Sequence, residues 1–205
     1  MSKLQFMRAL TGVAAILCPI AATAGIHTWD VNEVFSNADG TVQFVELWEA
    51  NGTPGEVGVG NGSMSSNSTS FAIGNGAVAP PTTNKFYLIA TPAFAALPGA
   101  PVPDKTIPAG SIPFFNTSGD TVAFVGVDSW TFGAVPTNGT QSLDRLTGVG
   151  TNTPTNYAGA TGTVDASGGG GPNVPLLPGP MIAFATLLVM GVGVGYLMTR
   201  RPKSR

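Results

Sequence analysis

The fold is decided by residues 29–49, WDVNEVFSNADGTVQFVELWE. The first part of this stretch alternates apolar and polar side chains, which predicts a strand with Trp29, Val31 and Phe35 on one face. A second run of the same kind covers residues 42–48. The residues between the runs end in Asp-Gly, a pair that tolerates the positive φ angles of a tight hairpin turn. The stretch therefore predicts two antiparallel strands joined by a short turn.

The remainder of the central region continues this pattern. A Gly, Ser and Asn-rich stretch at residues 51–68 follows the hairpin, and no segment shows helical periodicity over a useful length. Further short apolar or alternating runs are separated by turn residues and occupy residues 70–73, 86–90, 112–115, 121–127 and 129–132. About seven short strands predict an all-β chain, folded as an antiparallel β-sandwich.

The order of these runs resembles the lamin-tail domain, an immunoglobulin-like family. Its "I-N-E-I" and "F-V-E-L" strands are similar to residues 31–34 and 44–47, and its "G-D-x-V" and "S-L-x-R" motifs to residues 119–122 and 142–145. Two departures are the long insert after Trp48 and the short loop before Asp128. The residues that carry the resemblance are Asn32, Glu33, Glu46, Leu47, Gly119, Asp120, Ser142 and Arg145.

The resemblance implies an immunoglobulin-like antiparallel β-sandwich with a binding or scaffolding role, and it implies no particular enzymatic activity. It also implies that Glu33 and Glu46 are structural, bonded to backbone groups or to an arginine such as Arg145. An alternative from the residues alone is an extracellular hydrolase or carbohydrate-binding accessory that uses Glu46, Glu49 and an exposed Trp. Another is a domain stabilised by Ca²⁺, although no run has the Asp/Asn spacing of a calcium loop.

The charges are segregated along the chain. The formal net charge is −2, but the region between the two basic ends carries all eleven acidic residues against three basic ones, a formal charge of −8. Such a region has no basic footprint for a nucleic-acid partner. The single histidine, His27, lies near the start of the predicted domain and has no second imidazole with which to hold a metal. We therefore predict no bound cofactor and no catalytic residue.

The N-terminal end has the pattern of a secretory signal. Residues 1–24 contain two basic residues, a mostly small and apolar run, and the small-x-small cleavage motif of Ala22 and Ala24 before Gly25. A retained membrane anchor is the alternative. The only cysteine, Cys18, lies inside this segment, so the mature protein is expected to be free of thiols.

The C-terminal end has four parts. Residues 146–173 lack large apolar side chains, which predicts a flexible linker after a domain at 25–145. A proline-rich motif includes Val174, Pro175, Pro178 and Pro180. The uncharged apolar run from Met181 to Met198 is long enough for a short membrane helix. The basic tail of Arg200, Arg201, Lys203 and Arg205 predicts that this end lies in the cytoplasm.

Residues 174–205 resemble the C-terminal sorting signals of bacterial surface proteins that are handled by exosortases (PEP-CTERM signals). Val174 and Pro175 match the family motif, but Leu176 replaces its glutamate and the next proline follows one residue late. The segment is therefore either cleaved or retained as an anchor. Together the parts predict an exported protein at the cell envelope or surface, with a structural, adhesive or binding role. Its expected partners are the membrane, an exosortase-type enzyme, and a surface polysaccharide or protein.

Overall fold

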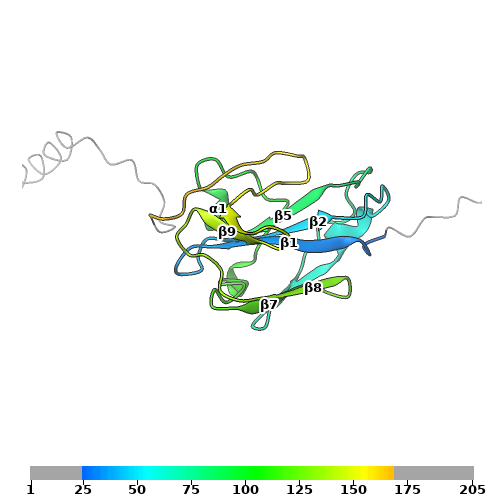
Figure 1. Ribbon diagram of the computed structural model, residues 1–205. Helices are drawn as coiled ribbons and strands as arrows, with labels where there is room; N and C mark the ends of the chain where they lie inside the picture. The colour runs from blue at the N-terminus through cyan, green and yellow to red at the C-terminus, as the bar shows by residue number, and fades with distance from the viewer. Residues whose placement is uncertain (1–24, 169–205) are drawn as a thin grey trace, which may run out of the picture.

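The computed structural model describes residues 25–168, and its regular secondary structure is almost entirely β, with ten strands and one short α-helix (Figure 1). No helix in this part of the chain has the length and apolar character needed to cross a bilayer. The predicted signal peptide, proline motif, membrane span and basic tail lie outside the described residues. The strands are β1 Trp29–Ser36, β2 Gln43–Glu49, β3 Ser63–Ser65, β4 Ser70–Ala72, β5 Phe86–Ala90, β6 Lys105–Thr106, β7 Asp120–Phe124, β8 Asp128–Phe132, β9 Gln141–Asp144 and β10 Gly148–Thr151.

The strands form two sheets. One sheet has the order β10-β9-β1-β2-β5-β6, and the other has the order β4-β3-β7-β8. All pairings are antiparallel except that of β5 with β6. One buried cluster contains side chains from β1, β2 and β5 of the first sheet and from β3, β7 and β8 of the second. The prediction of an all-β chain with largely antiparallel sheets is thus confirmed, and the two sheets share a core as in a β-sandwich.

The β1–β2 hairpin forms where the sequence predicts it, but β1 changes face midway. The register with β2 shifts between Val31 and Glu33, which marks a β-bulge. One extra residue reverses the alternation, so Trp29 and Val31 face the core between the sheets while Phe35 lies in a second cluster on the opposite face. The prediction that Phe35 shares a face with Trp29 and Val31 is therefore wrong.

The segment 112–115, expected to be a strand, is irregular. Phe114 and Phe115 are nevertheless buried in the core, and the amide side chain of Gln43 replaces a strand partner. Its oxygen accepts from Phe114 N–H at 2.6 Å, and its amide group donates to Phe115 O at 2.9 Å. The Gly-rich stretch 51–68 is also structured, because it contains the 3-10 turn η1 (Val57–Asn61) and strand β3.

The outer face of the larger sheet is covered by the chain's own C-terminal part. Phe35, Phe44 and Leu88 on this face pack with helix α1 (Pro92–Ala95) and with Val164 and Ala166 in a second buried cluster. The described chain therefore has three layers: the smaller sheet, the larger sheet, and a covering layer on the outer face of the larger sheet (Figure 1). Residues 152–167 form this covering layer, and we call them the covering segment.

The linker predicted at 146–173 is therefore wrong over residues 146–168. Strand β10 extends the larger sheet beyond β9, and the covering segment follows it directly. Gly139 shows how closely the segment lies against the domain: its carbonyl accepts from Ala166 N–H at 2.8 Å, and a Cβ at Gly139 would overlap the backbone of residues 166 and 167. A domain boundary at 145 cuts through a continuous structure.

Candidate functional site

Glu33 and Glu46 lie opposite each other on β1 and β2, on the outer face of the larger sheet. Each is only 1% exposed. Glu33 accepts hydrogen bonds from the backbone N–H and the hydroxyl of Thr153, at 3.0 and 3.1 Å. Glu46 accepts from Thr155 N–H at 2.7 Å and from the Asn32 amide at 3.0 Å. The two carboxyl groups therefore hold the covering segment against the sheet.

Burial changes the acidity of this pair. Desolvation, followed by repulsion from Glu33, raises the pKa of Glu46 to about 8. Desolvation also raises the pKa of Glu33, although hydrogen bonds from Ser142 and Thr153 oppose the shift. Two carboxylates in register on neighbouring strands repel each other, so the folded protein favours a proton on Glu46 near neutral pH.

Side chains beside this pair bond to further points along the covering segment. Asp104 accepts from the backbone N–H groups of both Leu88 and Tyr157 at 2.8 Å, and so joins β5 to the segment. The Asn152 side chain spans Thr140 and Val164, with contacts of 2.7 to 2.8 Å. Hydrogen bonds from polar side chains therefore act together with the apolar contacts of Val164 and Ala166 to hold the covering layer.

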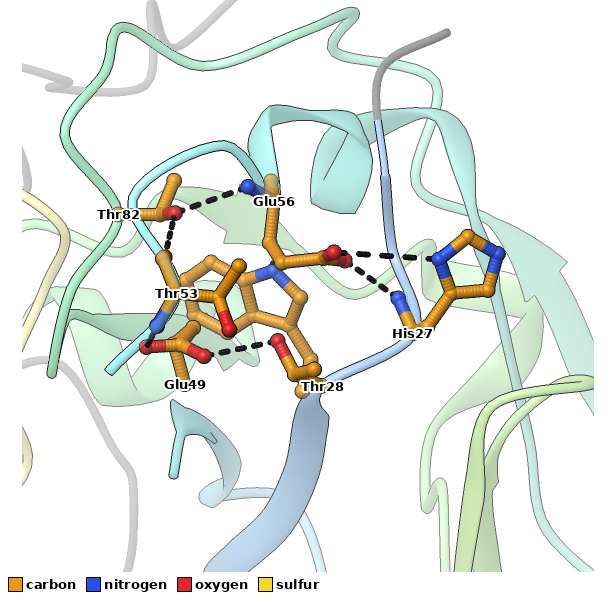
Figure 2. A network of polar contacts seen from close by, with 7 residues as sticks. His27, Thr28, Glu49, Thr53, Glu56 and Thr82 are labelled. Atoms are coloured by element: carbon orange, nitrogen blue, oxygen red, sulfur yellow. Dashed lines mark hydrogen bonds and ion pairs between the residues drawn. The ribbon is translucent and has the colours of Figure 1, made fainter. Parts of the chain in front are cut away.

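A second polar network lies at the start of β1, where the described chain begins (Figure 2). Glu49 accepts from the Thr28 hydroxyl at 2.8 Å and from Thr53 N–H at 3.0 Å. The Thr82 hydroxyl donates to Thr53 O and accepts from Glu56 N–H. Hydrogen bonds from Thr28 and from backbone N–H groups lower the pKa of Glu49 against its desolvation. The network fixes the loop after β2.

Glu56 faces the first residues of the described chain. Its carboxylate accepts from His27 N–H, and the His27 imidazole Nδ1 lies 3.8 Å from Glu56 Oε1 (Figure 2). The His27 side chain is 82% exposed and that of Glu56 only 10%. The Glu56 backbone carbonyl also accepts from the Trp29 indole N–H at 2.8 Å.

Backbone groups and an arginine such as Arg145 were the two expected partners of Glu33 and Glu46; backbone N–H groups bond to both glutamates, and Arg145 pairs with neither. Its guanidinium contacts Asp128 Oδ2 at 2.6 Å and Val31 O at 3.3 Å. The same Asp128 oxygen accepts from Val31 N–H at 2.9 Å. The partner differs because β9 ends before Arg145, so the arginine side chain reaches the start of β8 in the other sheet.

The remaining motif residues have structural positions. Leu47 is buried in the core between the sheets. Asp120 is buried and accepts from Asn67 N–H and Asn116 N–H, which ties two loops to the start of β7. Gly119 precedes it with φ of 134° in a turn where a Cβ would lie 3.1 Å from Phe132 O. Ser142 is buried beside Glu33.

These positions are unfavourable for the hydrolase alternative. Glu46 and Glu49 are buried, they serve different networks, and their oxygens are engaged by backbone donors. Trp29 is buried, and Trp48 and Trp130 are each half-buried beside a phenylalanine. Among residues 25–168 no group of three His, Cys, Asp or Glu side chains is arranged to hold a metal ion.

The surface has two features of note. Shallow depressions flank the β1–β2 turn; one is lined by Asp39, Pro113 and Asn116 among others, and another by Asn37, Thr137 and Ser167 among others. Exposed large apolar side chains occur singly in turns and at a sheet edge, and they are Val102, Val125, Leu146 and Val149. Such isolated side chains are ordinary on a protein surface.

The sequence predicted Glu33 and Glu46 as structural residues, and the structure brings them together. It did not predict the partners Thr153 and Thr155, or the roles of Asn152, Asp104 and Glu56. The only signal for these positions is the run of residues 151–156, Thr-Asn-Thr-Pro-Thr-Asn, whose side chains suit local hydrogen bonding as well as solvent.

Comparisons with known proteins identify no relative: no family model, no curated protein and no solved structure matches this chain.

Proposed function

We propose that this protein is exported and displayed at the cell envelope, where its β-domain has a non-enzymatic structural, adhesive or binding role. The N-terminal segment directs export and is removed. The C-terminal segment places the domain at the membrane, either as a lasting anchor or as a signal for an exosortase-type enzyme. The ligand class that best suits this role is a surface polysaccharide or another surface protein.

The sequence patterns of the two terminal segments carry the proposal, and the placement of the two ends of the described chain gives the displayed domain an orientation. Gly25 lies beside η1, where its carbonyl accepts from Gly58 N–H at 2.9 Å. Ser167 and Gly168 lie beside the β1–β2 turn, at the other end of β1 (Figure 1). A membrane segment that follows residue 168 would hold the domain by the β1–β2 turn. The opposite end, with the loop after β2 and the β7–β8 turn, would then be presented outward.

The acidic residues support a non-enzymatic role. Glu33, Glu46 and Glu49, the best catalytic candidates in the sequence, all bond to the chain's own backbone and serve to hold loops. A domain that stabilises itself in this way needs no disulfide, which agrees with a mature chain free of cysteine.

The finer family assignments belong to this proposal as well. Two sheets with a shared core, and the places of Asn32, Glu33 and Glu46 on the β1–β2 hairpin, support an immunoglobulin-like sandwich of the lamin-tail kind. Against a close relationship stands the covering layer over the larger sheet, which adds a second core to the domain.

Protease treatment of intact bacterial cells that produce the full chain tests the proposal. Digestion of the β-domain, while a cytoplasmic control protein stays intact, is the expected result. Protection of the domain until the cells are lysed would refute surface display. Mass spectrometry of the isolated protein then distinguishes the two forms of attachment: a chain that retains Arg205 is anchored, and a chain that ends within 174–180 has been processed.

A further inference from the structure

Glu56 is an incompletely satisfied carboxylate beside the predicted cleavage point. Its side chain is 10% exposed, and among residues 25–168 a single hydrogen bond reaches its carboxylate, from His27 N–H. A carboxylate accepts about four hydrogen bonds, and a charge withdrawn from water is costly unless it is paired. The nearby imidazole, 3.8 Å away and largely exposed, is beyond hydrogen-bond distance. This group therefore has capacity for a cationic partner.

Gly25 lies directly against that carboxylate. A Cβ built on Gly25 would lie 2.8 Å from Glu56 Cδ and 2.9 Å from Oε2, and still closer to Oε1. The nitrogen of Gly25 is bonded to the same Cα as that Cβ, so it lies within about 5 Å of the carboxylate oxygens. A side chain at residue 25 would therefore displace the Glu56 carboxylate from this position.

The position of Gly25 is also held from its other side. The Gly25 carbonyl accepts a hydrogen bond from Gly58 N–H. Two residues further on, the backbone N–H of His27 donates to the Glu56 carboxylate. These contacts do not involve any residue before Gly25. The residue would accordingly stay beside Glu56 after the peptide bond that precedes it is cut.

We propose that Glu56 is the binding site for the new N-terminus of the mature protein. Hydrolysis of the Ala24–Gly25 peptide bond by a signal peptidase consumes one water and leaves a carboxylate on Ala24 and an amine on Gly25. The amine is protonated at neutral pH, and its ammonium group has three N–H donors in place of the single amide N–H. It forms an ion pair with Glu56, so that removal of the signal stabilises the folded domain.

This inference rests on the proposed export, so the experiment first determines the mature N-terminus. The full chain is exported in a bacterial host, and the purified protein is sequenced from its N-terminus. A first residue other than Gly25 overturns both the predicted cleavage and the ion pair. A first residue of Gly25 supports export and leads to the second measurement.

The second measurement tests whether the effect of the α-amine on the melting temperature depends on Glu56. The α-amine is acylated selectively near pH 6.5, where lysines react little because their pKa is near 10.4. Blocking should lower the melting temperature of the natural protein by about 2–6 °C. It should have little further effect in Glu56→Gln, which keeps an acceptor and loses the charge. Equal losses in both proteins would overturn the ion pair while leaving export in place.

Two further variants identify the partner. Asp165→Asn removes an exposed acid at the other end of the domain and should leave the coupling unchanged. His27→Ala keeps the backbone donor to Glu56 and should also leave it unchanged; loss of the coupling in this variant would overturn the assignment to the α-amine.

The rate of acylation gives a readout that does not depend on the variants' folding. Pairing with Glu56 raises the pKa of the amine, and each unit lowers the fraction of reactive free amine about tenfold. The amine of the natural protein should therefore react several-fold more slowly than that of a free peptide with the sequence of residues 25–30. Equal rates would count against the ion pair even if Glu56→Gln failed to fold.

Discussion

Glu46 is a carboxyl group in the middle of a six-stranded sheet, and its environment decides its protonation. Asn32 and Thr155 each donate one hydrogen bond to it, yet desolvation and the neighbouring Glu33 outweigh them and raise its pKa to about 8. In the unfolded chain the same group titrates near 4.5. The folded state thus holds a proton that the unfolded state releases between these values, and its stability falls as the pH rises through that window.

Glu46→Gln should reduce this dependence, and the raised pKa of Glu33 should account for part of what remains. The amide keeps an acceptor for Thr155 N–H and carries no charge, so the variant's free energy of unfolding should change less between pH 5 and pH 8. In the natural protein the decline should approach, at most, about 1.4 kcal/mol per pH unit. Urea unfolding at three pH values measures the difference.

The matched control for this prediction is Asp39→Asn. Asp39 is exposed in the β1–β2 turn, and hydrogen bonds from Thr41 lower its pKa, so it stays ionised throughout the window. The control should keep the full slope. Identical slopes in the natural protein and in Glu46→Gln would show that Glu46 is not protonated in the fold.

The Asp128–Arg145 pair joins the two sheets at the residue scale. Both side chains are partly buried, at 16% and 33% exposure, and Asp128 also accepts from Val31 N–H. A double-mutant cycle with Asp128→Asn and Arg145→Met should give a coupling of about 1 kcal/mol in the free energy of unfolding. A coupling near zero would mean that solvent screens the pair and that the sheets are held by their apolar core alone.

Among the elements, the covering segment has the structure that its amino-acid composition predicts least well. Residues 152–167 include two buried aliphatic side chains, Val164 and Ala166, in a context of Thr, Asn, Gly and Pro. Such a composition is typical of linkers because it buries little apolar surface. Here Glu33, Glu46 and Asp104 accept hydrogen bonds from backbone N–H groups of the segment, and all three lie far from it in the sequence. Asn152, at the start of the segment, bridges Thr140 and Val164.

Two valine-to-alanine substitutions test whether this element belongs to the folded domain. Val164 is 1% exposed in the second cluster, and Val102 is 78% exposed on a neighbouring loop. Val164→Ala should lower the free energy of unfolding by about 1–3 kcal/mol. Val102→Ala should leave it within about 0.5 kcal/mol of the natural value. Equal and small effects would indicate that residues 152–167 form a linker after all.

At the scale of the whole molecule, the two ends of the domain lie at different distances from the proposed membrane anchor. The described chain ends beside the β1–β2 turn, and the β7–β8 turn lies towards the other end, since Asp128 bonds to Val31 near the start of β1. Removal of Cys18 with the signal would leave a mature chain without thiols. Single cysteines introduced at the two ends then report which end is accessible.

Val125→Cys in the β7–β8 turn should react with a bulky, membrane-impermeant maleimide several-fold faster than Ala38→Cys in the β1–β2 turn, when the protein is on intact cells. Both positions are exposed in the isolated domain. After extraction into detergent the two rates should therefore become similar. Faster reaction of Ala38→Cys on cells would reverse the proposed orientation.

Local pattern was enough for the strands of the hairpin and for β4, β5, β7 and β8, because alternation, or a short apolar run bounded by turn residues, indicates a strand directly. It was insufficient for β3, β6, β9 and β10, which have two to four residues each. It also missed the bulge in β1, since a shift of register depends on the partner strand. The structural role of Glu33 and Glu46 came from a family resemblance, and the residues they hold came only from the structure.

The sequence by itself determined the all-β class, the central hairpin, the segregation of charge and the pattern of the two ends. These properties depend on residues close together in the chain or on composition. Only the tertiary structure decided that residues 146–168 belong to the domain, that Arg145 pairs with Asp128, and that Gly25 lies against Glu56. Each of these depends on contacts between residues many positions apart, and a buried carboxyl group acquires its partners and its pKa only when folding removes it from water.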